Sequence, residues 1–296
     1  MSGSSKTSQP QCTDFRTVAR ALTIVENNLE PAGELLKGLV FKKTAPIIGI
    51  TGPPGAGKST LVNALIDHLL AGGKKIAVLA VDPTSPFNFG SLLGDRIRMA
   101  AHFNHPDVFI RSLAARGSLG GLSAKTIEMT DVLRGAGFDY VIIETVGVGQ
   151  SEVEIAGLAD LTFLVLVPES GDEVQNMKSG LMEIADAFII NKADRADAEL
   201  FANNLVKILH QNGSDDTPVF KTVATNNEGI TEVAAYILSA SHKKSGRKEF
   251  LLAEKAYRII QQKRMADLDK KKLAQEIAAA IKQGPFNLYA FVENYF

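Results

Sequence analysis

Short apolar runs alternate with helix-like stretches through the middle of the 296-residue chain. Most of these runs are apolar throughout, which is typical of parallel strands that helices cover on both faces. We therefore predict an α/β fold with a mostly parallel sheet, helices on both of its faces and helical extensions at both ends. Seven runs have strand length, in one-letter code PIIGI, KIAVLAVD, VFIRSL, FDYVIIET, LTFLVLVP, AFIINK and PVFKTVA.

The two ends of the chain have helical periodicity instead. Residues 14–40 read as helix, with Asp14 as a possible N-cap and a break at Pro31. Beyond the polar stretch SHKKSGRKE, one long amphipathic helix is expected from about residue 249 to 282. The expected organisation is a disordered start and N-terminal helical extension (1–42), a central α/β domain (43–245) and a C-terminal helical arm (246–296). The apolar face of the first helix would be Phe15, Val18, Ala19, Leu22 and Val25.

Composition narrows the class of protein only a little. A formal net charge of −1 gives no overall bias toward nucleic acid or membrane surfaces. The single cysteine, Cys12, cannot form an internal disulfide, which fits a reducing compartment. No apolar run approaches the roughly 18 residues of a membrane span. We expect a cytoplasmic protein without nucleic-acid or membrane partners.

The segment GITGPPGAGKSTLVNAL carries the first chemistry. Gly52, Gly57, Lys58 and Ser59 fit the G-x-x-x-x-G-K-[ST] pattern of a phosphate-binding loop, between a predicted strand and a predicted helix. Backbone N–H groups and the positive end of the helix dipole would then point at the phosphates. Lys58 would reach the β- and γ-phosphates and Ser59 would ligate Mg²⁺. The residues that would hold the phosphates are Gly52, Pro53, Pro54, Gly55, Ala56, Gly57, Lys58, Ser59 and Thr60.

The run AFIINKADR indicates which base is bound. Asn191, Lys192 and Asp194 form an N-K-x-D string at the carboxyl end of a late strand, where open α/β sheets bind ligands. The Asp194 carboxylate can accept hydrogen bonds from N1–H and the exocyclic amine of guanine, whereas adenine has no donor at N1. The alternative is a solvated polar loop. The string favours GTP and GDP as ligands.

Three acidic residues lie where a Mg²⁺ site could use them. Asp82 ends one predicted strand, Glu144 ends another, and Asp95 lies in the loop GSLLGDRIRM. Each could instead be a solvated loop acid. The Gly147 amide, three residues after Glu144, would sense the γ-phosphate. Val148 stands where Ras-like switches carry the glutamine that orients water, so hydrolysis by the chain alone should be slow.

With these residues in place, the sequence resembles the MeaB/ArgK/MMAA family of G3E-type P-loop GTPases. The matching blocks between residues 52 and 195 are GPPGAGKST, VDPTSPF, GDRIRM, RGSLGGL, ETVGVGQSE, GDEVQNMKSG and NKADR. The resemblance implies a GTP-hydrolysing chaperone of adenosylcobalamin-dependent methylmalonyl-CoA mutase or a related acyl-CoA mutase. Such proteins gate cofactor delivery, protect or reactivate the mutase, and form homodimers held partly by terminal helices.

The same resemblance implies roles for individual residues. Lys178, in the block GDEVQNMKSG, would belong to a third switch that responds to the mutase, and with Lys58 and Glu144 would serve hydrolysis. Ser59, Asp82, Asp95 and Glu144 would serve Mg²⁺. The loop that closes over the base reads Val223-Ala224-Thr225 instead of the usual Ser-Ala pair, so the Ala224 amide would contact guanine O6.

Two other functions remain open at this point. Some relatives carry a label as an arginine-transport-system kinase, or ATPase, but the N-K-x-D string speaks against ATP. A metal-insertion GTPase is the other alternative. His102 and His105 could share a helix face as a metal pair, although the chain has no C-x-x-C motif and no cluster of histidines in its sequence.

Overall fold

The computed structural model of the chain describes residues 10–11, 13–41, 45–82, 99–114, 124–145, 155, 157–170, 185–240 and 248–295. The chain divides into two compact units, Met1–Leu251 and Leu252–Phe296. None of the helices in the described ranges is long and apolar enough to cross a membrane.

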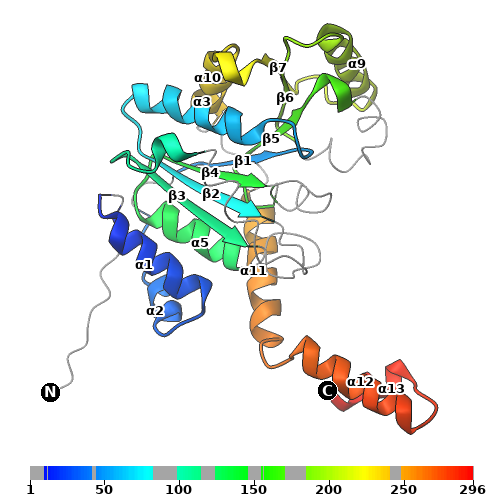
Figure 1. Cartoon of the computed structure of the whole chain (residues 1–296). Coiled ribbons are helices and arrows are strands. Elements are labelled where there is room, and N and C mark those ends of the chain that lie inside the picture. Colours follow the sequence, from blue (N-terminus) through cyan, green and yellow to red (C-terminus); the bar gives the residue numbers. More distant parts are fainter. Residues whose placement is uncertain are drawn as a thin grey trace, which may run out of the picture. The chain divides into compact units, whose positions relative to one another are not determined.

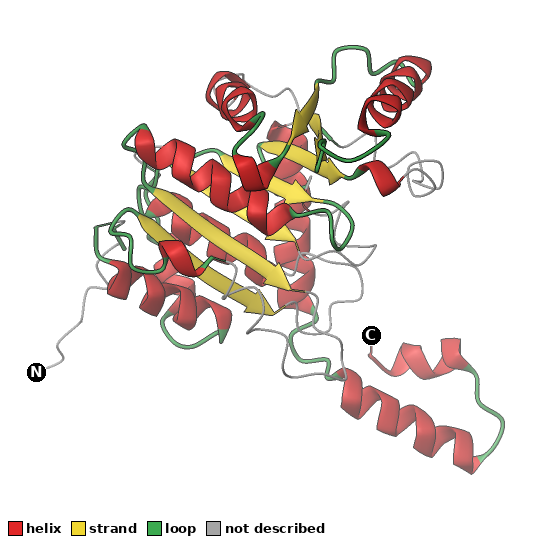
Figure 2. Cartoon of the chain, turned by 45° about the horizontal axis from the view of Figure 1, so that its top comes forward, coloured by secondary structure: helices red, strands yellow, loops and turns green. Residues whose placement is uncertain are grey.

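A seven-stranded sheet forms the centre of the first unit, with its layers shown in Figures 1 and 2. The strand order is β3-β2-β4-β1-β5-β6-β7, and every neighbouring pair is parallel. All seven predicted runs are strands, because buried β-branched and aromatic residues fill a sheet that is covered on both faces. The strands are β1 (Ile47–Thr51), β2 (Ile76–Asp82), β3 (Val108–Ala114), β4 (Tyr140–Thr145), β5 (Leu161–Leu166), β6 (Ala187–Asn191) and β7 (Val219–Thr222).

Helices cover both faces of this sheet, as predicted. On one face, α3 and α10 pack against a core that includes Ile48 and Ile50 of β1. On the other, α9 packs against Leu164 of β5 and Phe188 of β6, and α5 lies on the opposite side of the sheet from α3 (Figure 1). The helices of the first unit are α1 (Phe15–Glu26), α2 (Ala32–Lys37), α3 (Lys58–Ala71), α5 (Ala124–Gly135), α9 (Ala198–Gln211) and α10 (Ile230–Ala240).

The N-terminal extension is two helices that pack onto the sheet layer. Asp14 caps α1, since its carboxylate accepts from the amides of Arg16 and Thr17 at 3.1 and 3.2 Å. Pro31 lies between α1 and α2, as the sequence indicated. The apolar face of α1 is buried against the rest of the unit, at Val18, Ala21, Leu22 and Val25.

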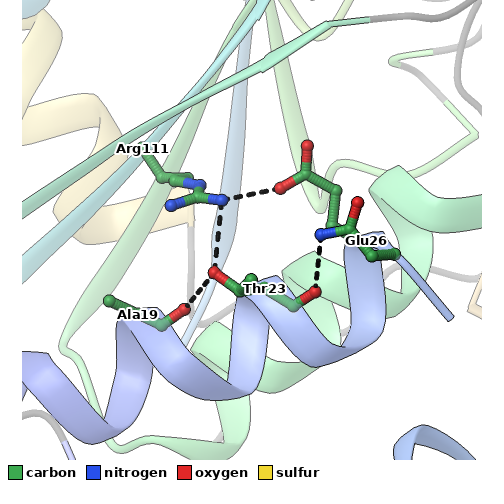
Figure 3. A network of polar contacts seen from close by, with 5 residues as sticks. Ala19, Thr23, Glu26 and Arg111 are labelled. Atoms are coloured by element: carbon green, nitrogen blue, oxygen red, sulfur yellow. Dashed lines mark hydrogen bonds and ion pairs between the residues drawn. The ribbon is translucent and has the colours of Figure 1, made fainter. Parts of the chain in front are cut away.

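A polar contact joins the end of α1 to the edge strand β3 (Figure 3). The Arg111 guanidinium donates to the Glu26 carboxylate at 2.7 Å and to the Thr23 hydroxyl at 3.4 Å. Thr23 in turn donates to the carbonyl oxygen of Ala19 at 2.9 Å. At the other end of α1, the ring of Phe15 makes an edge-to-face contact with Phe109 of β3. Apolar burial and a directional ion pair thus act together to hold α1 against β3.

The second unit contains α12 (Lys270–Gln283), α13 (Leu288–Val292) and most of α11 (Lys248–Arg264). The prediction of one continuous helix from about 249 to 282 was wrong, because this segment forms two helices. The chain leaves the helix after Arg264, and α12 restarts where the Asp269 carboxylate accepts from the Lys271 amide at 2.8 Å. Aspartate competes with helical hydrogen bonding and favours caps, so Asp269 starts a new helix within the expected one.

Candidate functional site

The glycine-rich segment forms the loop between β1 and α3. Gly52 has φ 142°, and a Cβ there would collide with the carbonyl oxygen of Val165 on β5. Gly57 has φ 83° at the N-cap of α3, and a Cβ there would collide with the amide nitrogen of Asn191. The loop therefore needs glycine at both positions, first to leave the sheet and then to pass close to the side chain of Asn191 at the end of β6.

Lys58, the first residue of α3, turns back across this loop. Its Nζ donates to the carbonyl oxygens of Gly52 at 2.8 Å and Pro53 at 2.9 Å. The residue is only 6% exposed. An ammonium group and a helix N-terminus therefore converge on the same loop, which is the electrostatic arrangement that binds phosphate.

A hydroxyl and a carboxylate meet beside the loop. Ser59 follows Lys58 on α3, and its hydroxyl donates to the Glu144 carboxylate at 2.6 Å. Both side chains are buried, Glu144 at the end of β4 being 2% exposed. A buried carboxylate is costly unless it is paired, and oxygen ligands of this kind suit Mg²⁺. The two residues fit the proposed metal role.

Of the other residues predicted near the metal, the structure describes only the backbone of Asp82. Asp82 ends β2 and pairs in register with Ala114 of β3, so its backbone reaches the same edge of the sheet as the P-loop. Its side chain, Asp95 and Gly147 are outside the described residues, as is Lys178. Within the described ranges, no three His, Cys, Asp or Glu side chains form a metal-binding group.

Asn191 links three segments of the site. Its amide nitrogen donates to the carbonyl oxygen of Ala56 in the P-loop at 2.9 Å. Its side-chain oxygen accepts from the Thr222 hydroxyl at 3.1 Å and from the Ala224 amide at 3.2 Å. The residue is 2% exposed. The phosphate loop, the end of β6 and the loop after β7 are thereby held at one edge of the sheet.

The remaining predicted base contacts border this junction. Lys192 donates from Nζ to the carbonyl oxygen of Gly55 at 2.7 Å, while Asp194 is exposed. The predicted loop Val223–Thr225 lies beside them, but the Ala224 amide donates to Asn191 in this structure. Contact between that amide and a base oxygen would require the Asn191 hydrogen bond to be shared or exchanged.

Sequence reasoning missed three residues that support the junction. Thr222 was part of a predicted strand, and its hydroxyl orients Asn191. Arg195 forms an ion pair with Glu169, which lies in the 3₁₀ turn Pro168–Ser170 after β5. The Arg195 hydrogen bond is the largest cause that lowers the pKa of Glu169. A basic residue directly after N-K-x-D was the available signal.

The two histidines weighed as a metal pair have separate partners. His102 ends the 3₁₀ turn Ala100–His102 and lies 3.6 Å from the Asp67 carboxylate. His105 is in the following turn, where its Nδ1 accepts from the Asp107 amide at 3.2 Å. They do not share a helix, so the predicted common helix face is not formed.

The P-loop geometry and the Asn191 junction agree with comparisons to known proteins. A protein of Pyrococcus abyssi whose name describes it as a candidate GTPase is 46% identical over 280 residues, 92% of this chain and 86% of that protein. The mouse mitochondrial homologue of methylmalonic aciduria type A is 37% identical over 240 residues, 73% of this chain and 57% of that protein.

Structure and family comparisons point the same way. The crystal structure of an LAO/AO transport system kinase superimposes with a TM-score of 0.66 and 25% identity, over 95% of this chain and 92% of that one. The family model described as "Methylmalonyl Co-A mutase-associated GTPase MeaB" matches residues 18–281. The chain therefore belongs to the MeaB family of P-loop GTPases.

Proposed function

We propose that the chain binds and slowly hydrolyses GTP with Mg²⁺, and that it acts as a chaperone of an adenosylcobalamin-dependent acyl-CoA mutase. The observation that carries the nucleotide part is the Asn191 junction. One buried side chain bonds both the phosphate loop, at Ala56, and the loop after β7, at Ala224. A ligand with phosphates at one end and a base at the other would span the two.

Each P-loop residue has a task in such a site. Lys58, which bonds two loop carbonyls, would exchange those bonds for phosphate oxygens, because a bond between two charged groups is stronger than one to a neutral carbonyl. Ser59 and Glu144 would hold Mg²⁺, which would neutralise charge that develops on the phosphates. Val148 stands where Ras-like switches carry the glutamine that orients water, so we expect the unaided rate to be slow.

Base identity is tested at Asp194. We expect Asp194→Asn to weaken GTP binding and to improve binding of xanthosine triphosphate, whose 2-oxo group prefers a donor. Asp197→Asn, three residues further on and also exposed, is the matched control and should leave both affinities unchanged. Equal affinities of the parent protein for ATP and GTP would refute the guanine assignment.

The chaperone part rests on family membership and on the block GDEVQNMKSG. We propose that Lys178 offsets charge on the transferred phosphate when the mutase brings its loop into place, and that two copies of the chain associate through their C-terminal arms. The test is GTP turnover with and without methylmalonyl-CoA mutase. Completing a site of this kind contributes roughly 10³- to 10⁵-fold in other GTPases.

We expect Lys178→Ala to keep GTP affinity and the slow basal rate but to lose most of the stimulation. Lys207→Ala, a change at an exposed lysine of α9, should be stimulated like the parent. Equal stimulation of the Lys178 variant would remove this residue from the mechanism.

A kinase is the second candidate, because the solved relative that covers 95% of this chain is described as an LAO/AO transport system kinase. The same turnover assay separates the two functions when the γ-phosphate is labelled. A GTPase releases the label as inorganic phosphate, whereas a kinase transfers it to an added acceptor protein. Label on the acceptor, dependent on ATP, would favour the kinase.

A further inference from the structure

Asp194 lies in a four-residue turn, Lys192–Arg195, directly after β6. The Arg195 amide donates to the carbonyl oxygen of Lys192 at 3.1 Å and closes the turn. The Ala193 amide donates to the carbonyl oxygen of Thr222 at 3.0 Å and attaches the turn to the end of β7. Asp194 itself is exposed, so its direction depends on how the turn is held.

The first and last residues of this turn, Lys192 and Arg195, bond to neighbouring loops. Lys192, with a left-handed φ of 57°, donates from Nζ to Gly55 of the P-loop. Arg195 pairs from Nη1 with the carboxylate of Glu169, just beyond β5. In the sheet, β5 lies between β1 and β6, so the three loops that follow these strands are neighbours. The turn is therefore fixed on two sides.

We propose that Arg195 is a positioning residue for base discrimination. By pairing with Glu169 it holds the turn so that the Asp194 carboxylate faces the edge of the base. This inference rests on the proposed binding of guanine. The carboxylate must meet N1–H and the 2-amino group together, and a small rotation of the turn would keep one contact while lengthening the other.

Charge supports the same arrangement. Hydrogen bonding from Arg195 is the first cause that lowers the pKa of Glu169, and the charge of Lys192 contributes further. Glu169 is therefore a carboxylate at neutral pH, attracted by the positive charges of both Arg195 and Lys192. Its side chain is 53% exposed and that of Arg195 46%. An ion pair this exposed contributes little to folding, so removing it should leave the melting temperature unchanged and any effect on ligand preference can be measured separately.

The experiment compares dissociation constants for GTP and ITP, because hypoxanthine lacks the 2-amino group. In the parent protein GTP should bind more tightly than ITP. Arg195→Ala and Glu169→Gln should each reduce this preference about two- to fivefold, mainly by weakening GTP, with an unchanged melting temperature. Arg195→Lys should retain part of the preference, and the exchange Glu169→Arg with Arg195→Glu should restore part of it.

Two controls separate the possible failures. Lys221→Ala breaks a comparably exposed ion pair with Glu199 and should leave the GTP-to-ITP ratio unchanged. Asp194→Ala should remove the preference altogether; if it does not, the proposed guanine site itself is wrong. If Asp194→Ala removes the preference while the Arg195 and Glu169 variants retain it, only the positioning role is wrong.

Discussion

The helices at the two ends of the chain are amphipathic, α1 more strongly than α11 and α12, and their apolar side chains differ in burial. In α1, Val18, Leu22 and Val25 are fully buried. In α11 and α12, Leu252, Ile260 and Ile281 are each more than half exposed. The first helix finds its apolar partner within its own unit. In the C-terminal arm, by contrast, these apolar side chains are exposed.

This difference shows what amphipathic periodicity predicts. A stripe of apolar residues predicts a helix with one face to bury, because helices gain most of their stability from packing. It does not identify the surface that buries it. For α1 that surface is β3 and α5, whereas for the arm we proposed a second copy of the chain.

The largest expected effect follows from removing the arm. Deleting residues 247–296 should convert a dimer into a monomer in light scattering, while GTP binding by the first unit is retained, because the P-loop and the Asn191 junction lie within residues 52–224. A truncated protein that remains dimeric would exclude the arm from the interface and leave its apolar residues unexplained.

The next effect concerns the buried helix. Leu22→Ala should lower the free energy of unfolding by about 2 to 5 kcal/mol, since it leaves a cavity at a fully buried position. Leu252→Ala, a matched change at a side chain that is 54% exposed, should cost less than about 0.5 kcal/mol when the chain is monomeric. Urea denaturation measures both. Equal costs would mean that the two helices are packed alike.

The sequence predicted the strands better than the ends of the helices. Seven apolar runs gave seven strands, since a sheet buried on both faces requires nearly continuous apolar residues. The break before α12 was missed, because apolar residues such as Ile260 and Leu273 recur on both sides of it. Capping by a single carboxylate outweighed a pattern that is spread over many residues.

For the site, sequence patterns located the phosphate loop and the residues around Asn191 but not what supports them. Gly52, Lys58 and Asn191 belong to patterns set by the ligand and could be identified without a structure. Thr222 and Glu169 act by contact across neighbouring strands, and those contacts depend on the strand order β1-β5-β6-β7. The spacing of residues within a sequence motif does not show the order of the strands in the sheet.

A smaller effect is expected at the ion pair that joins α1 to β3. Arg111→Met leaves the Glu26 carboxylate, 14% exposed, without its guanidinium and should cost about 1 to 3 kcal/mol of unfolding free energy. Adding Glu26→Gln should recover part of this loss. In the arm, Lys272→Met breaks a 3.9 Å pair with Glu276 that is far more exposed, and should cost less than about 0.5 kcal/mol. A similar loss from both would contradict the contrast in burial.

The smallest expected effect is the pH dependence of the α1 cap. Hydrogen bonds from the hydroxyl and then the amide of Thr17 lower the pKa of Asp14 below its ordinary value of 3.8. A lowered folded-state pKa means that the unfolded chain takes up the proton first, so the cap stabilises fully above 3.8 and loses this contribution as pH falls through the lower folded value. Asp14→Asn keeps a capping side chain but has no proton to take up, so its unfolding free energy should fall less steeply below about pH 4. Asp269 is the corresponding cap of α12. Asp269→Asn is the control, which shows how the same substitution in the arm changes the slope. Urea denaturation at several acidic pH values gives the slopes, and equal slopes for the parent and Asp14→Asn would show that the Asp14 cap contributes no pH dependence.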